Sequence, residues 1–337
     1  MKTLRLTGLA LLIALAGCRE EAPTPQPYAQ GVFVLNEGNF LSANASISYY
    51  NPEADTVALD VFAAANNRPL GDVLQSATRI GDRIFWVVNN SQKIEVTDGN
   101  LKSVGTVTGL TSPRYIAAVS DQKAYVTDLF SGNVSVLNTE TLAITGTISI
   151  PGWTERVLVL GPDAFIVNSG RPYVYVVNTA TDQVTDSIRT AAGTNSLTQD
   201  ADGNLWVLCG GDYVTGEKGN LYRINPVTRT ITLALPFSSG GYPGQLTTSP
   251  DKKILYYLDG GVFAMAISDA TLPVTPFIGA GSASFYGMTV HPETGDLYVA
   301  DAVDYTQAGR GLRYSASGSL LATFATGLIP NGFLFIE

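Results

Sequence analysis

Side chains that could do chemistry gather in segments that follow short apolar runs. The acidic members are Glu37, Asp72, Asp128, Glu155, Asp212, Asp301 and Asp304. A pair of carboxylates can hydrolyse a glycosidic bond or hold calcium. None of these residues belongs to a compact Asp-x-Asp-x-Asp loop, and no acid stands beside a base at a recognisable catalytic spacing. The sequence therefore predicts no catalytic residue, no metal and no cofactor.

The histidine and one of the cysteines are explained by structure rather than by chemistry. His291 is the single histidine and opens the segment 291–295, whose Pro, Glu, Thr and Gly favour a tight turn. Without a second histidine, the chain has no histidine-rich metal centre. Cys209 follows the apolar run Leu205–Leu208, which predicts a small buried side chain rather than a reactive thiol.

Aromatic and arginine side chains in the same segments favour binding. The aromatic ones are Phe40, Tyr115, Phe130, Trp153, Tyr173, Tyr213, Tyr242, Phe285, Tyr286 and Tyr305. The arginines are Arg68, Arg114, Arg156, Arg171 and Arg310. Brought together, they would form a funnel with flat apolar walls and hydrogen-bond donors. Such a surface suits a large amphipathic ligand or a protein loop better than it suits bond-breaking chemistry.

The elements that must position these side chains repeat along the chain. Residues 111–151 contain four short runs with alternating apolar residues, which predict a four-stranded antiparallel meander. The same pattern returns about every 40 to 45 residues, the spacing of propeller blades. Full units are expected at 72–109, 111–151, 153–192, 194–238, 242–281 and 285–327.

The two ends of the repeat array complement each other. Residues 31–36, 45–50 and 56–62 supply three strands, and residues 330–336 supply one more. We therefore predict an all-β fold over residues 31–337, a seven-bladed β-propeller of four-stranded antiparallel blades. The C-terminal strand would close it by pairing with the N-terminal blade, because closure removes exposed sheet edges.

This register places the candidate site on one rim. If the first strand of each blade lines the central channel, the loops after second strands and the connections between blades share one rim, and these loops are the longer ones. The residues predicted to bind a ligand there are Asn36, Glu37, Asn39, Phe40, Asn89, Ser91, Arg114, Tyr115, Asp128, Phe130, Arg156, Asn168, Arg171, Asp212, Tyr213, Tyr242, Tyr286, Asp301 and Tyr305.

The N-terminus predicts export and a lipid anchor. Residues 1–17 combine two early basic residues with a short apolar run, as in a cleaved signal peptide. Leu15-Ala16-Gly17-Cys18 resembles the lipobox of bacterial lipoproteins, in which the cysteine is acylated. Residues 18–30 would then be the lipidated Cys18 and a Pro-rich tether. The formal net charge of −9 gives no attraction to nucleic acid.

Several segments resemble a known family. The segments Gly31–Asn39, Ser48–Asn51, Leu70–Asp72, Val88–Val96 and Val167–Gly170 are similar to those of the YncE-like surface lipoprotein propellers. A branch of that family captures cobalamin and passes it to a TonB-dependent outer-membrane transporter. The resemblance implies a non-enzymatic, surface-exposed protein anchored by lipid in the outer membrane, which captures a bulky nutrient such as cobalamin or another corrinoid.

Two other hypotheses remain open at this point. The same rim could bind a protein or a surface glycan, which would make the chain an adhesive or structural module. A propeller lyase or hydrolase that uses rim carboxylates is the third, and it is disfavoured because no acid and base are paired in the sequence. The fold alone does not decide among these functions.

Overall fold

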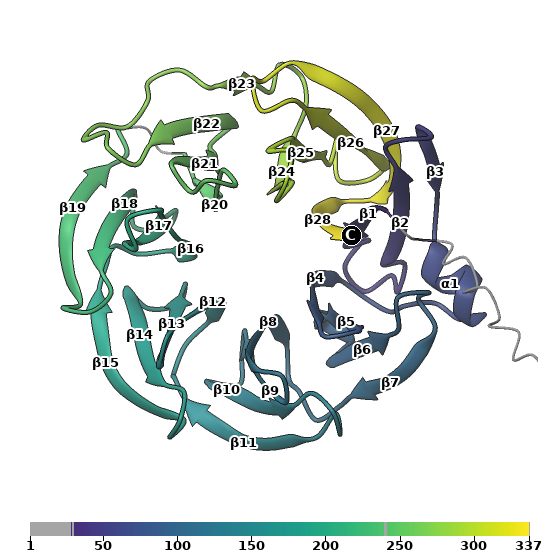
Figure 1. The fold of residues 1–337 in the computed structure, drawn as a ribbon, viewed down its shortest axis with the longest axis horizontal. Coiled ribbons are helices and arrows are strands. Elements are labelled where there is room, and N and C mark those ends of the chain that lie inside the picture. The colour runs from purple at the N-terminus through teal and green to yellow at the C-terminus, as the bar shows by residue number, and fades with distance from the viewer. Residues whose placement is uncertain (1–27, 29, 239–240, 337) are drawn as a thin grey trace, which may run out of the picture.

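Seven four-stranded antiparallel sheets stand around a central channel in the computed structural model, which describes residues 28, 30–238 and 241–336 (Figure 1). The predicted seven-bladed propeller is therefore confirmed. The predicted signal peptide and Cys18 lie outside the described residues, as does nearly all of the tether.

The innermost strands are β4 (Leu74–Ile80), β8 (Pro113–Ser120), β12 (Thr154–Leu160), β16 (Thr194–Gln199), β20 (Gly244–Thr248), β24 (Phe285–Val290) and β28 (Pro330–Ile336). The second strands are β5 (Arg83–Val88), β9 (Lys123–Asp128), β13 (Asp163–Asn168), β17 (Leu205–Asp212), β21 (Ile254–Leu258), β25 (Leu297–Asp301) and β1 (Gly31–Asn36). These second strands are almost entirely buried, because a blade packs against both of its neighbours.

The third strands are β6 (Lys93–Thr97), β10 (Asn133–Asn138), β14 (Tyr173–Asn178), β18 (Glu217–Asn225), β22 (Gly261–Ala266), β26 (Ala308–Tyr314) and β2 (Ser46–Asn51). The outer strands are β7 (Ser103–Val107), β11 (Ile144–Ser149), β15 (Gln183–Arg189), β19 (Thr230–Pro236), β23 (Ile278–Gly279), β27 (Leu320–Leu328) and β3 (Thr56–Ala58). The outer strands are largely exposed, so apolar residues alternate only weakly along them.

The closing blade combines both ends of the array, as predicted. β28 pairs antiparallel with β1, and Phe333 stands opposite Val34 in the register. Phe333 is buried and packs on Tyr298 of the preceding blade, with 5.6 Å between ring centroids. The closing strand thus contributes core contacts as well as a sheet edge.

One predicted strand is partly wrong. Residues 56–62 were expected to form a strand, but β3 ends at Ala58 and a short helix α1 (Val61–Asn66) follows. Asp60 has φ of 49°, in the left-handed region, which ends the extended backbone before the helix. Val61 and Phe62 are buried, so the helix covers the side of the closing blade near its outer edge (Figure 1).

Candidate functional site

Each inner strand is bulged near its start, and the bulges line the end of the channel at which the inner strands begin. A bulge sets two residues opposite one on the neighbouring strand and turns an extra side chain away from the regular alternation. The bulges contain Gln75 in β4, Arg114 and Tyr115 in β8, Glu155 and Arg156 in β12, Asn195 in β16, Gln245 and Leu246 in β20, Tyr286 in β24, and Asn331 in β28.

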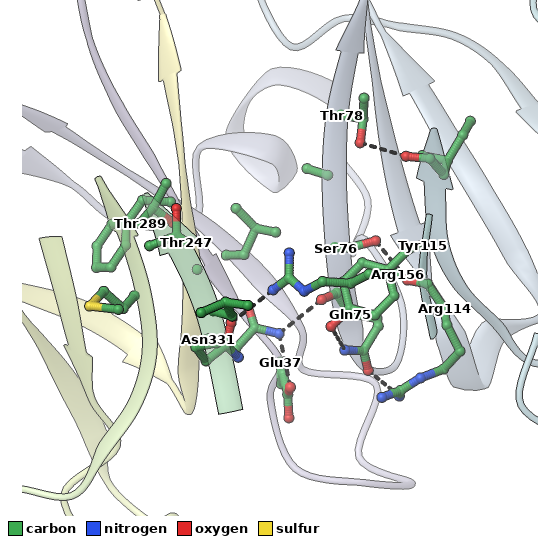
Figure 2. A pocket seen from close by; sticks show the side chains of 18 of the residues that line it. Glu37, Gln75, Ser76, Thr78, Arg114, Tyr115, Arg156, Thr247, Thr289 and Asn331 are labelled. Carbon is green, nitrogen blue, oxygen red and sulfur yellow. Dashed lines mark hydrogen bonds between the residues drawn. The ribbon is translucent and has the colours of Figure 1, made fainter. Parts of the chain in front are cut away.

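Most of these side chains surround one cavity, which we call the channel mouth. It has a volume of about 440 Å³ and is lined by bulge residues and by Glu37, which directly follows β1. Figure 2 shows Gln75, Arg114, Arg156 and Asn331, each from a different inner strand, around this space with Glu37 from the loop after β1. Apolar side chains also line the cavity, among them Leu35, Ile116, Leu197, Met288 and Phe333. The channel mouth is therefore a cavity with a mixed polar and apolar lining.

Glu37 is held by donors from two inner strands. Its carboxylate accepts a hydrogen bond from Asn331 Nδ2 at 2.8 Å and from the Tyr286 hydroxyl at 3.2 Å. Burial raises the pKa of Glu37, and these two hydrogen bonds only partly oppose that rise. Glu37 can therefore hold a proton more readily than an exposed glutamate does.

Arg114 and Glu155 form an ion pair at the edge of the channel mouth. Arg114 Nε and Nη2 lie 3.0 Å and 2.8 Å from Glu155 Oε1, and Arg114 also donates to Gln75 Oε1. Its guanidinium lies over the ring of Trp153, 5.4 Å from the centroid. Burial raises the pKa of Glu155 despite the neighbouring Arg114, because the carboxylate is almost completely removed from solvent. The pair braces three neighbouring inner strands.

Arg156 extends across the channel mouth from β12. Its Nη2 donates to Gln245 Oε1 on β20 at 2.8 Å, and its guanidinium stacks on the Tyr115 ring at 4.8 Å. This hydrogen bond bypasses β16, which stands between the two strands in the ring (Figure 1). Arg156 therefore presents a cation to the cavity rather than to a neighbouring carboxylate.

A second and larger cavity opens on the loop-rich rim beside the channel mouth, and we call it the rim groove. It measures about 850 Å³. Its walls include Trp153, Arg171, Arg189, Tyr213 and Tyr242. Glu155 lines it too, so the Arg114–Glu155 pair forms part of the wall between the two cavities.

The floor of the rim groove is made of closely approaching backbone. Gly193 has φ of 68°, and a Cβ placed there would lie 2.3 Å from the carbonyl oxygen of Gly211. Backbone bonds join Gly210 N to Gly193 O at 2.8 Å and Gly211 N to Ala192 O at 3.0 Å. Only glycine fits such an approach, so the groove owes its depth to these residues.

Aromatic faces and arginines form the sides of the rim groove. Tyr213 and Tyr242 lie with ring centroids 5.6 Å apart, and Tyr213 is 81% exposed. Within the described part of the chain, Arg171 and Arg189 form no ion pair with a carboxylate. Asp212 caps its own turn, since its Oδ1 accepts from Val214 N at 2.8 Å, and these backbone bonds lower its pKa. The groove thus combines flat surfaces with free hydrogen-bond donors.

Five predicted ligand residues are buried and hold loops together instead. They are Asn36, Asn89, Asp128, Asn168 and Asp301, all at or just after the end of a second strand, and all at most 7% exposed. Asn36 Oδ1 accepts from Gly327 N, and Asp128 Oδ2 accepts from Ser112 N at 2.7 Å. Asp301 Oδ1 accepts from Ser284 N and Val303 N, each at 2.9 Å. Burial excludes these side chains from a surface site, which corrects the prediction that they face a ligand.

The remaining predicted residues divide among three places. Glu37, Arg114, Tyr115, Arg156 and Tyr286 line the channel mouth, whereas Arg171, Asp212, Tyr213 and Tyr242 line the rim groove. Phe40, Phe130 and Tyr305 are exposed on the rim outside both cavities, as is the partly exposed Asn39. Ser91 Oγ accepts from Asp72 N at 2.9 Å and supports a loop. The predicted site is therefore two cavities and a set of separate rim contacts.

Several site residues were missed. Gln75, Gln245 and Asn331 in the channel mouth, and Arg189 and Glu217 in the rim groove, were not predicted. A signal for the first three exists, because each stands at the same blade position as Arg114–Tyr115. Comparing equivalent positions between blades would have found it.

Neither a metal cluster nor a membrane-spanning helix is found in the described ranges. No group of three or more His, Cys, Asp or Glu side chains is arranged there to hold a metal ion. No helix among those residues is long and apolar enough to cross a bilayer.

A protein family matches most of the chain. Residues 30–319 match the family described as "Domain of unknown function (DUF5074)". The matched segment runs from the start of β1 to the residue before β27. The chain belongs to the DUF5074 family. No curated protein sequence matches this DUF5074 member.

Solved structures share the propeller fold of this DUF5074 protein. A quinonprotein alcohol dehydrogenase-like protein from Bacteroides thetaiotaomicron is 16% identical, with a TM-score of 0.71 over 92% of this chain and 79% of that one. A protein from Lactobacillus plantarum is 17% identical, with a TM-score of 0.68 over 91% of this chain and 99% of that one. Dihydro-heme d1 dehydrogenase NirN in complex with DHE is 12% identical, with a TM-score of 0.65 over 96% and 78%. At these identities the likeness establishes the fold alone.

Proposed function

We propose that this protein is a non-enzymatic binding protein that captures a bulky amphipathic small molecule in the rim groove. Cobalamin or a related corrinoid is the ligand that we put forward first. Under this proposal Cys18 carries a lipid anchor in the outer membrane, the propeller faces the cell exterior, and the ligand passes to a TonB-dependent transporter.

The rim groove is the observation that carries this proposal. Its volume of about 850 Å³ lies in the upper part of the range of about 300–1,000 Å³ found for ligand pockets. A corrinoid has a flat ring surrounded by amide groups and a nucleotide phosphate. The Tyr213 and Tyr242 faces suit the ring, and the guanidiniums of Arg171 and Arg189 suit the amide oxygens and the phosphate. Among the structural neighbours, NirN was solved with a ligand, DHE.

Calorimetry with cyanocobalamin tests the ligand. We expect binding by the wild-type protein and at least about a tenfold loss of affinity in Tyr213→Ala, because a ligand that covers this exposed ring makes it a buried aromatic anchor. Phe130→Ala is the matched control, because Phe130 is a 75% exposed aromatic on the same rim outside the groove. No heat at micromolar concentrations, or equal losses in both variants, would remove cobalamin from the proposal.

Fractionation of cells tests the proposed location in the outer membrane. Wild-type protein should sediment with outer membranes and become labelled with palmitate, and Cys18→Ser should abolish both. Protease added to intact cells should digest the wild-type protein if the propeller faces outward. Protection from the protease, with sedimentation unchanged, would place it on the periplasmic face instead.

Capture of a protein partner through the same rim is the second candidate function. It is favoured by apolar side chains that stand outside the cavities. Phe40 is 66% exposed, Leu41 76%, Phe130 75% and Val214 91%. These side chains lie on loops of three different blades, so a protein partner that spans the rim would cover all four. Cross-linking from these positions in outer-membrane vesicles would identify the partner, and Phe40→Ser should reduce the cross-link.

A further inference from the structure

Arg156 brings a cation with unused hydrogen-bond donors into the channel mouth. Its one side-chain hydrogen bond within the described residues goes to neutral Gln245, and it forms no ion pair there. Arg114, by contrast, is neutralised by Glu155. A guanidinium carries five N–H donors in a planar fork, and Arg156 uses one of them. Free parallel donors on a cation recognise a planar carboxylate in two-pronged fashion.

Asn331 presents an acceptor with no protein donor. Its Nδ2 lies among three acceptors, with Glu37 Oε1 at 2.8 Å, Leu74 O at 3.0 Å and Gln75 O at 3.1 Å. This environment fixes the orientation of the amide. Its Oδ1 is buried and receives no hydrogen bond from the described residues. A buried acceptor without a donor costs about 1–3 kcal/mol, so a donor from a bound molecule would be favourable.

On the side of the cavity formed by β20 and β24, two hydroxyl groups form no hydrogen bond with the described residues. Thr247 and Thr289 line it, whereas the Ser76 and Thr78 hydroxyls donate to backbone carbonyls of β8 (Figure 2). Glu37 is the one carboxylate among the described residues that line the cavity. The channel mouth therefore offers the guanidinium of Arg156, with unused donors, and several groups that form hydrogen bonds with hydroxyls.

Size limits the occupant. The volume of about 440 Å³ is about half that of the rim groove, and Leu246, Met288 and Phe333 are among the residues that line it. We propose that the channel mouth is a second binding site, for a small hydroxylated monocarboxylate of the aldonic acid class. Its carboxylate lies on Arg156, and its hydroxyls pair with Asn331 Oδ1, Glu37 and the two threonines. This site is independent of the ligand in the rim groove.

Titration calorimetry of the purified full chain with D-gluconate tests this site. Acetate has the carboxylate without the hydroxyls, and D-glucose has hydroxyls without the carboxylate. We expect gluconate to bind at least about tenfold more tightly than either probe. Arg156→Gln should weaken gluconate binding by about tenfold or more, as expected for loss of a charge-assisted pair. Arg79→Gln, the same change at an exposed arginine of β4 that lines neither cavity, should leave gluconate binding unaltered.

Three outcomes would overturn the proposal. They are gluconate binding no tighter than acetate or glucose, the same affinity in Arg156→Gln as in wild type, and an equal loss in Arg79→Gln. If Arg156→Gln fails to fold by circular dichroism, Arg156→Lys decides, because lysine keeps the charge but not the fork. Weaker gluconate binding by Arg156→Lys supports the site, and unchanged binding refutes it. Cyanocobalamin binding, measured separately with Tyr213→Ala, reports only on the rim groove.

Discussion

Replacing Asn36 with alanine is expected to destabilise the propeller rather than to remove a ligand contact. The side chain is fully buried and connects three segments. Its Nδ2 donates to Ser46 O at 3.2 Å and Ser48 Oγ at 3.0 Å, and its Oδ1 accepts from Gly327 N at 3.0 Å. Alanine deletes these bonds and leaves the partly buried Gly327 N–H without its acceptor. Each net hydrogen bond is worth about 1 kcal/mol, and an orphaned buried group adds about 1–3 kcal/mol. The expected loss in unfolding free energy is about 2–4 kcal/mol.

Equilibrium unfolding in urea, followed by tryptophan fluorescence, measures this loss. Trp86 is a suitable reporter, because its ring packs 5.6 Å from Phe33 in the same closing region. Asn39→Ala is the matched control, since the side-chain hydrogen bonds of Asn39, to Tyr305 O and from Asn44 Nδ2, are exposed and their loss should cost about 0.5 kcal/mol or less. An Asn36→Ala unfolding curve that overlays the wild type, together with weaker cyanocobalamin binding, would refute the structural role and restore Asn36 as a contact.

Three further changes probe closure, burial and protonation. Phe333→Ala should cost about 3–5 kcal/mol of unfolding free energy, because it empties a site packed on Tyr298; an unchanged urea midpoint would mean that β28 does not close the core. Burial raises the pKa of the Cys209 thiol to about 11, so a Cys18→Ala protein should resist a disulfide reagent at about pH 8 until it is unfolded, and fast labelling of the native protein would contradict this. The pKa of Glu37 is raised above its usual 4.5, so the native state binds the proton more tightly than the unfolded chain does, and stability falls as pH rises through the native pKa. The unfolding free energy of Glu37→Gln relative to wild type should therefore improve between about pH 4 and about pH 7, and a constant difference would contradict this assignment.

Repetition made the architecture predictable. Every blade uses the same order of short runs and turns, so errors in one unit are corrected by the others, and the orphan strand at 330–336 completed the count. The helix at Val61–Asn66 was not predicted, because it spans fewer than two turns and is too short for a helical period to appear in the sequence. The alternating Val57, Leu59 and Val61 continued a strand pattern instead. The change of structure comes from the left-handed backbone at Asp60, which has no signal in hydrophobic spacing.

The candidate site was only partly predictable, because a bulge shifts the alternation by one residue. Arg114 and Tyr115 were predicted to lie on the rim, and the structure places both in the channel mouth. The buried Asn36 and Asn168 were misinterpreted for a different reason. Polar residues at loop starts usually meet solvent, but here their amides satisfy backbone groups of neighbouring segments.

The bulge in each of the seven inner strands separates residues that pack between blades from residues that line the lumen. Residues that follow the regular alternation hold one blade against the next, whereas most inserted side chains line the lumen and bond to one another across it. Exchanging Gln75, Gln245 or Tyr286 therefore alters the lining of the lumen together with the contacts of Arg114, Arg156 or Glu37. An engineer who diversifies these positions should vary each residue with its partner, so that a compact library keeps the contacts that cross the channel.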